Sequence, residues 1–168
     1  MAAKVFVAVV LLGSMPFGAT AESDHQAAGG TEWFVSSSDG VVSATVGHGL
    51  EISIACNVRT SSATITVTFD KYKGRLLKTA RDSELPFILD VQNTPGGNQK
   101  FPVGAYYTDA DGGDNWVFNK GVTPAFLDAF GQEGGRLRWR TADGVVIASW
   151  PLRGTARARD AMRRVCNL

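Results

Sequence analysis

Few side chains of this chain could act as catalytic bases. The sequence contains two histidines, His25 and His48. A serine nucleophile needs a neighbouring base and an orienting carboxylate, and no Gly-x-Ser-x-Gly elbow accompanies either histidine. His25 lies in a polar segment and His48 stands between two glycines. We therefore interpret both as solvated residues of a tail and a turn.

The acidic loop at residues 109–115 offers a second kind of chemistry. Its residues Asp109, Asp111 and Asp114 are hard oxygen donors of the type that Ca²⁺ prefers in short loops. The spacing starts as Asp-x-Asp-Gly, but Gly113 takes the fifth position and no glutamate takes the twelfth. We favour an ordinary solvated turn, and a calcium site is the weaker alternative.

Paired carboxylates for glycoside hydrolysis would have to come from acids that no spacing brings together. These acids are Glu32, Asp70, Asp82, Glu84, Asp90 and Asp128. The sequence also lacks a His/Cys metal cluster, a phosphate-binding glycine loop and a cofactor fingerprint. We therefore expect no catalytic residues, no resident metal and no cofactor.

Arginines gather towards the end of the chain. A closing helix would carry Arg153, Arg157, Arg159, Arg163 and Arg164, and a preceding strand would carry Arg136, Arg138 and Arg140 on one face. One interpretation is a docking surface for an acidic partner or for anionic envelope polymers. The alternative is that the arginines cover the solvent side of an amphipathic helix and favour its dipole.

The first residues predict export. Lys4 precedes the apolar run Val5 to Leu12, Pro16 breaks it, and Ala19-Thr20-Ala21 supplies small residues for cleavage. This is the pattern of a secretory signal peptide at residues 1–21, followed by a flexible leader at 22–30. The apolar core is far shorter than the roughly 20 residues needed to span a bilayer. We expect a mature protein that is soluble in a periplasm or secreted.

An exported chain with an even number of cysteines is typical of disulfide bonding. Cys56 and Cys166 are the two cysteines here, and they are not in a Cys-x-x-Cys arrangement. We predict one structural disulfide that ties an early strand to the end of the chain.

Composition and length limit the class of binding partner and the number of domains. The formal net charge is +1 and 20% of the residues are charged, which argues against a nucleic-acid binder. The 168-residue chain leaves room after the leader for one β-rich domain at residues 31–168. The sequence does not set the oligomeric state.

Short apolar segments predict a mainly β fold. Strand character appears at residues 32–36, 41–46, 50–56, 63–69, 86–91, 103–107, 116–118, 136–140 and 145–150. The segments Leu50 to Cys56 and Ala63 to Phe69 alternate with a period of 2, so one face of each enters the core. Residues 93–99 look like a loop.

Two helices are expected late in the chain. Thr123, Pro124 and Gly131 are the cap, the first helical residue and the stop of a short helix. Residues 155–165 form a closing helix with an apolar stripe of Ala158, Ala161, Met162, Val165 and Cys166. The fold class is mainly β (α+β): an antiparallel β-sandwich or curled sheet with the short helix and the C-terminal helix packed on it.

Several strings occur in order along the chain: Gly49-Leu50-x-Ile52-x-Ile54-x-Cys56, Phe69-Asp70-x-Tyr72-x-Gly74, Trp116, Pro124-Ala-Phe-Leu127-x-x-Phe130, Pro151-Leu152-x-Gly154 and a final helix ending in Cys166. In this layout the chain resembles the small periplasmic proteins associated with type VI secretion, of the TagO and VasI kind, and their uncharacterised proteobacterial relatives. The resemblance implies a periplasmic β-rich domain with a Cys56–Cys166 bridge and no known catalysis. Residues 78–82, Lys-Thr-Ala-Arg-Asp, take the place of that family's arginine-aspartate signature.

Together these observations predict an exported, non-enzymatic envelope protein that acts by binding an envelope protein partner, as an accessory of a secretion system. The alternative is a small hydrolase or lyase that acts on envelope polymers through scattered acids. A third interpretation is an inhibitor of envelope-targeting hydrolases, with residues 93–100 or 109–115 as the loop that enters an active site.

Overall fold

The structure is a computed structural model that describes residues 31–47, 50–69, 83–108, 114–119, 121–166 and 168. Several predictions lie outside the described residues: the signal peptide, the leader, both histidines, Asp70, Asp82, Asp109, Asp111 and the segment 78–82. Within the described residues, no helix is both long and apolar enough to cross a membrane.

The described residues form nine strands and two helices. They are β1 (Phe34–Ser38), β2 (Val41–Val46), β3 (Leu50–Asn57), β4 (Ser62–Phe69), β5 (Leu85–Thr94), β6 (Gly97–Thr108), β7 (Asp114–Asn119), α1 (Pro124–Phe130), β8 (Arg136–Thr141), β9 (Val146–Pro151) and α2 (Thr155–Cys166).

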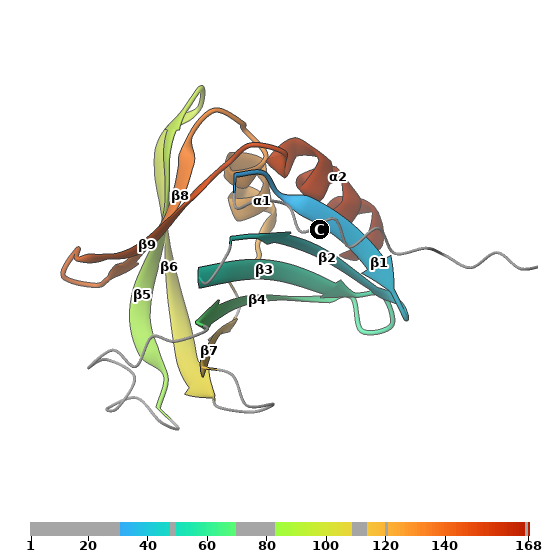
Figure 1. Cartoon of the computed structure of the whole chain (residues 1–168), viewed down its shortest axis with the longest axis horizontal. Helices are drawn as coiled ribbons and strands as arrows, with labels where there is room; N and C mark the ends of the chain where they lie inside the picture. Colours follow the sequence, from blue (N-terminus) through green and yellow to red (C-terminus); the bar gives the residue numbers. More distant parts are fainter. Residues whose placement is uncertain (1–30, 48–49, 70–82, 109–113, 120, 167) are drawn as a thin grey trace, which may run out of the picture.

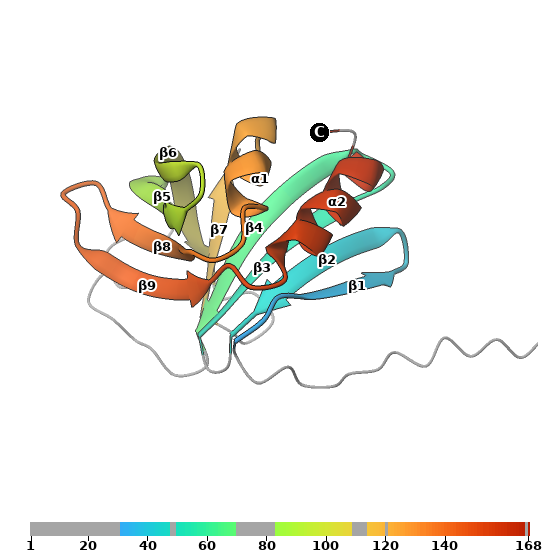
Figure 2. The same ribbon diagram turned by 90° about the horizontal axis from the view of Figure 1, so that it is seen from above.

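All nine strands belong to one antiparallel sheet in the order β1-β2-β3-β4-β7-β6-β5-β8-β9. The first four strands form a meander, and β7 inserts between β4 and β6. Figures 1 and 2 show that the sheet bends so that β5, β6, β8 and β9 stand across the direction of β1 to β4, with both helices on the inner side. The mainly β, α+β fold class is confirmed, and of its two forms the curled sheet is present.

Alternation along the strands places the core on the inner face. In β3, Ile52, Ile54 and Cys56 are fully buried, whereas Glu51, the residue before Ile52, is exposed. Registered neighbours continue this face from strand to strand. This inner face also carries four large aromatic side chains whose rings contact one another mainly edge to face. They are Phe87, Trp116, Phe118 and Trp139.

The helices close the inner face. Thr123 caps α1, because its side-chain oxygen accepts a hydrogen bond from the Phe126 amide at 3.1 Å. Glu133 serves the start of α2, where its Oε1 accepts from the Gly154 amide at 3.1 Å and the Ala156 amide at 3.4 Å. A carboxylate at this end also favours the helix dipole. Both predicted helices are confirmed.

The predicted loop at residues 93–99 is wrong. Strand β5 continues to Thr94 and β6 begins at Gly97, and these two residues pair across a tight hairpin. Gly97 has φ +81°, which a glycine adopts without strain, and the hydroxyl of Thr94 donates to the Gly97 carbonyl at 2.8 Å. A string rich in Asn, Pro and Gly is compatible with a long loop and with a tight turn. Here the turn is tight, and the strand pairing shifts its register between Val91 and Thr94.

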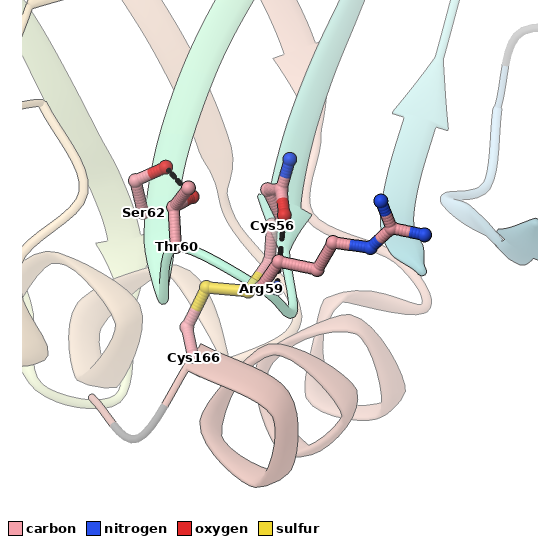
Figure 3. Close-up of a disulfide and its surroundings, with 6 residues drawn as sticks. Cys56, Arg59, Thr60, Ser62 and Cys166 are labelled. Carbon is pink, nitrogen blue, oxygen red and sulfur yellow. Dashed lines mark hydrogen bonds between the residues drawn. A yellow bond between two sulfur atoms is a disulfide. The ribbon is translucent and has the colours of Figure 1, made fainter. Parts of the chain in front are cut away.

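The predicted disulfide joins Cys56 on β3 to Cys166 at the end of α2 (Figure 3). Both cysteines are buried and their Cα atoms lie 6.0 Å apart. The bond spans 110 residues, and on the chain-entropy model a loop of that length stabilises the fold by about 4 to 5 kcal/mol. It therefore fixes the last turn of α2 against the inner face of the sheet.

Candidate binding surfaces

A groove opens between the first strand and the last helix. It has a volume of about 340 Å³ and is lined by Trp33, Phe34 and Val35 from one side and by Arg157, Asp160, Ala161 and Arg164 from α2. One wall is thus apolar and the other carries guanidinium groups. We call this the β1–α2 groove.

Trp33 holds the apolar wall in place. Its amide donates to the Arg153 carbonyl at 2.9 Å and its indole N–H donates to the Pro151 carbonyl at 2.7 Å. Its ring meets Phe130 of α1 edge to face, with centroids 4.7 Å apart. The chain can approach this closely because Gly154 has no side chain: a Cβ there would lie 3.0 Å from the Trp33 carbonyl oxygen. The wall is therefore preorganised.

Strand β1 is an edge of the sheet. In the described sheet it pairs with β2 on one side alone, so its other side presents backbone amides and carbonyls of the kind that add a further strand. Phe34 begins this strand and is 39% exposed. An extended chain that lies along β1 would meet Phe34 and the α2 arginines together.

The structure divides the five predicted surface arginines into two sets. Towards β1, Arg153 and Arg157 both contact Glu32, at 3.6 and 2.9 Å, and Arg164 forms no ion pair with a described residue. Towards α1, Arg163 pairs with Asp128 at 2.5 Å, and Arg159 bonds to its neighbour Asp160 at 2.9 Å. The five residues therefore do not make one continuous basic surface.

Electrostatics in the groove act on Asp160. The hydrogen bond from Arg159 is the largest influence and lowers the pKa of this carboxyl below its ordinary value of 3.8. Desolvation is the second influence and opposes it by raising the pKa, and the positive charges of Arg159, Arg164 and Arg163 each lower the pKa by a smaller amount. Asp160 is thus ionised at neutral pH and offsets part of the positive charge of α2.

The three arginines of β8 lie on the outer face of the sheet, away from both helices, because they alternate with the buried Leu137 and Trp139. Arg140 is fixed there by Asp90 of β5, whose Oδ2 accepts from Arg140 Nη1 at 2.9 Å and from Gln92 Nε2 at 2.5 Å. Arg140 Nη2 also donates to the Gly144 carbonyl at 2.7 Å. Asp90 is fully buried.

The acids that we considered for catalysis have other partners where they are described. Glu32, Asp90 and Asp128 each form an ion pair with arginine. Asp114 belongs by its backbone to β7. Among the described residues, no group of three or more His, Cys, Asp or Glu side chains could hold a metal ion.

A shallow depression of about 830 Å³ lies at the start of β5 and the middle of β6. It is lined by Glu84, Pro86, Pro102, Gly104 and neighbouring backbone. Its polar side chain, Glu84, is exposed and packs over Gly104. The depression brings no second titratable group to that carboxylate among its lining residues.

Protein-family models, curated proteins and solved structures give no match to this chain. The resemblance to secretion-associated periplasmic proteins stays a prediction.

Sequence reasoning missed the β1–α2 groove and the Asp90–Arg140 pair. The run Trp33-Phe34-Val35 carries a signal for the first, because three successive apolar residues of a strand cannot all face one core. Asp90 interrupts the apolar string Phe87 to Val91 at an outward position. No sequence spacing connects it to Arg140, 50 residues away.

Proposed function

We propose that this protein is an exported, disulfide-bonded envelope protein that acts by binding, without catalysis, and that its partner presents an extended acidic segment to the β1–α2 groove. The observation that carries the proposal is the coincidence in one groove of an apolar wall, two accessible arginines and a strand that forms the edge of the described sheet. Export rests on the signal-peptide pattern of the sequence.

Strand addition would supply the affinity. An extended segment beside β1 satisfies backbone groups along its length, and pockets for alternate side chains give selectivity. Phe34 and Val35 provide apolar contact at the start of β1. A partner segment with an aliphatic or aromatic residue at that point would bury surface worth about 25 cal/mol per Å².

Charge would supply the selectivity for acidic segments. Arg157 is 75% exposed and its bond to Glu32 is a surface ion pair, which is worth about 1 kcal/mol at most. A partner carboxylate can therefore replace Glu32 at small cost. Arg164 has no carboxylate to release among the described residues. Arg157 and Arg164 can therefore each donate a charge-assisted hydrogen bond to a carboxylate of an acidic segment.

A peptide library displayed on phage and selected against the mature, oxidised protein tests this chemistry directly. We expect enrichment of segments that combine Asp or Glu with one large apolar residue. Binding of the selected peptides, measured by fluorescence anisotropy, should fall at least tenfold in Arg157→Glu/Arg164→Glu.

The matched control is Arg136→Glu/Arg138→Glu, which makes the same charge change on the outer face of β8, away from the groove, and should leave peptide affinity within about twofold. Enrichment of basic or purely apolar peptides, or equal loss in both variants, would refute the groove as the binding site. Turnover of an envelope glycan by the purified protein would instead establish the hydrolase or lyase alternative.

A further inference from the structure

A second basic surface lies on the opposite side of the molecule, on the outer face of β5, β6, β8 and β9. The strand registers place its residues in rows across the sheet. One row is Lys100, Asp90, Arg138 and Ser149, and the next is Pro102, Ile88, Arg140 and Val146. Arg136 begins a third row beside Gln92 and Pro151. We call this the outer basic face.

The positive charge of the outer basic face is poorly compensated. Its rows hold four cationic side chains and one carboxylate, Asp90, which is fully buried and already bound to Arg140. Two exposed carboxylates border the rows: Glu84, which packs over Gly104, and Asp143 in the β8–β9 turn. Within the described residues, Lys100, Arg136 and Arg138 form no ion pair. This contrasts with the arginines at α2 and just before it, where three carboxylates, Glu32, Asp128 and Asp160, pair with four of the five arginines.

Exposed aliphatic side chains lie at one end of this face. Val145 is 60% exposed and Val146 is 46% exposed, and they rank among the few large apolar residues exposed in the described chain. Val146 is registered with Arg140 beyond the register shift that follows Trp139, so these two residues lie opposite each other on the neighbouring strands. In both views, the β8–β9 turn next to these valines projects beyond the rest of the sheet and away from the helices (Figures 1 and 2).

A basic face bordered by two exposed valines fits the surface of an anionic lipid bilayer, with Asp143 as the one exposed carboxylate of the described β8–β9 turn. The valines can enter the boundary between headgroups and acyl chains, while arginines bind phosphates and keep their stems in apolar surroundings. A soluble polyanion would complement the arginines and leave the valines in water. We propose that the outer basic face docks this protein on anionic membranes. This site is independent of the β1–α2 groove.

Co-sedimentation with vesicles tests the proposal. The mature, oxidised protein is mixed with vesicles of phosphatidylcholine alone or of phosphatidylcholine with phosphatidylglycerol. We expect binding that requires phosphatidylglycerol and weakens as salt rises. Because each arginine near such a surface contributes a factor of about five, the partition coefficient of Arg136→Gln/Arg138→Gln should fall about 25-fold.

Three further variants distinguish charge from loss of fold, a lipid surface from a soluble polyanion, and the outer basic face from the β1–α2 groove. Arg136→Lys/Arg138→Lys keeps the charge and should keep most of the binding, which distinguishes charge from loss of fold. Val145→Ser/Val146→Ser should reduce vesicle binding several-fold but leave any binding to soluble polyphosphate unchanged. Arg157→Gln/Arg164→Gln, on the groove, should bind vesicles like the unaltered protein.

Equal binding to neutral vesicles, an unaffected Arg136→Gln/Arg138→Gln variant, or indifference to the valine substitutions would overturn the proposal. In the last case, competition by polyphosphate would reassign the face to a soluble polyanion. Peptide binding in the groove is measured separately, so failure of the membrane experiment leaves the proposed function standing.

Discussion

The indole N–H of Trp33 donates a 2.7 Å hydrogen bond to the carbonyl oxygen of Pro151, across 118 residues of sequence. Trp33 directly precedes β1 and Pro151 ends β9, and these are the two edge strands of the sheet. The curl of the sheet thus brings its first and last strands together at one point. The same contact positions one wall of the β1–α2 groove.

Trp33→Phe removes the donor and keeps most of the ring. We expect a loss of about 1 kcal/mol in the free energy of unfolding, because the partly buried hydrogen bond to the Pro151 carbonyl is lost. Urea unfolding followed by far-ultraviolet circular dichroism measures it. Phe34→Ser, at an exposed neighbour, should change stability by less than about 0.5 kcal/mol. Equal stability of Trp33→Phe and the unaltered protein would contradict this role.

The disulfide should carry a large part of the stability. Replacing both Cys56 and Cys166 by serine should lower the free energy of unfolding by about 4 kcal/mol, because the unfolded chain regains the freedom of a 110-residue loop. Unfolding of the oxidised protein with and without reductant gives an independent measurement without substitution. An unfolding midpoint that reductant does not move would show that the bridge contributes little.

The Asp90–Arg140 pair should be strongly coupled. Arg140→Met leaves a buried carboxylate without its counter-charge and should cost about 3 kcal/mol. The double variant Asp90→Leu/Arg140→Met removes both charges and should recover most of that loss. A double-mutant cycle from urea unfolding yields the coupling energy. If the two single effects simply add in the double variant, the pair is not coupled.

The sequence predicts the parts of this fold that depend on near neighbours. Alternation predicted the strands at Leu50 to Cys56 and Ala63 to Phe69, each within one residue of the observed ends of β3 and β4, and the Thr123-Pro124 start predicted α1. Strand ends were less well placed where turn residues continue a strand, as at Thr94 and Gly97. Whether such residues form a loop or a tight hairpin depends on the register of the strands that flank them.

Contacts between segments that are distant in the sequence were harder to predict than local elements. The insertion of β7 between β4 and β6, and the approach of Trp33 to Pro151, depend on the curl of the whole sheet. Cysteine pairing was accessible because the chain offers one partner for Cys56. The positions of the arginines on the helix could be predicted from the sequence. Their ion-pair partners could not, because Glu32 and Asp128 lie outside α2.

Asp160 should titrate at an unusually low pH. Its pKa is lowered in the folded state, chiefly by the hydrogen bond from Arg159, so this contact contributes stability above the unfolded pKa and is lost as pH falls through the folded pKa. Carbon-detected NMR of the side-chain carboxyl measures the midpoint. Arg159→Gln should move it up towards 3.8. A midpoint that is insensitive to this substitution would exclude Arg159 as the main cause.

Photo-cross-linking in the living cell shows whether a partner occupies the β1–α2 groove. A cross-linking amino acid replaces Phe34 in the groove or, as control, Val58, which is 46% exposed and lies just after β3. We expect one protein to be captured at position 34 through an extended acidic segment, and this product should be absent at position 58 and lost when Arg157→Glu/Arg164→Glu is added. The same products at both positions, or capture that survives the charge reversal, would contradict it.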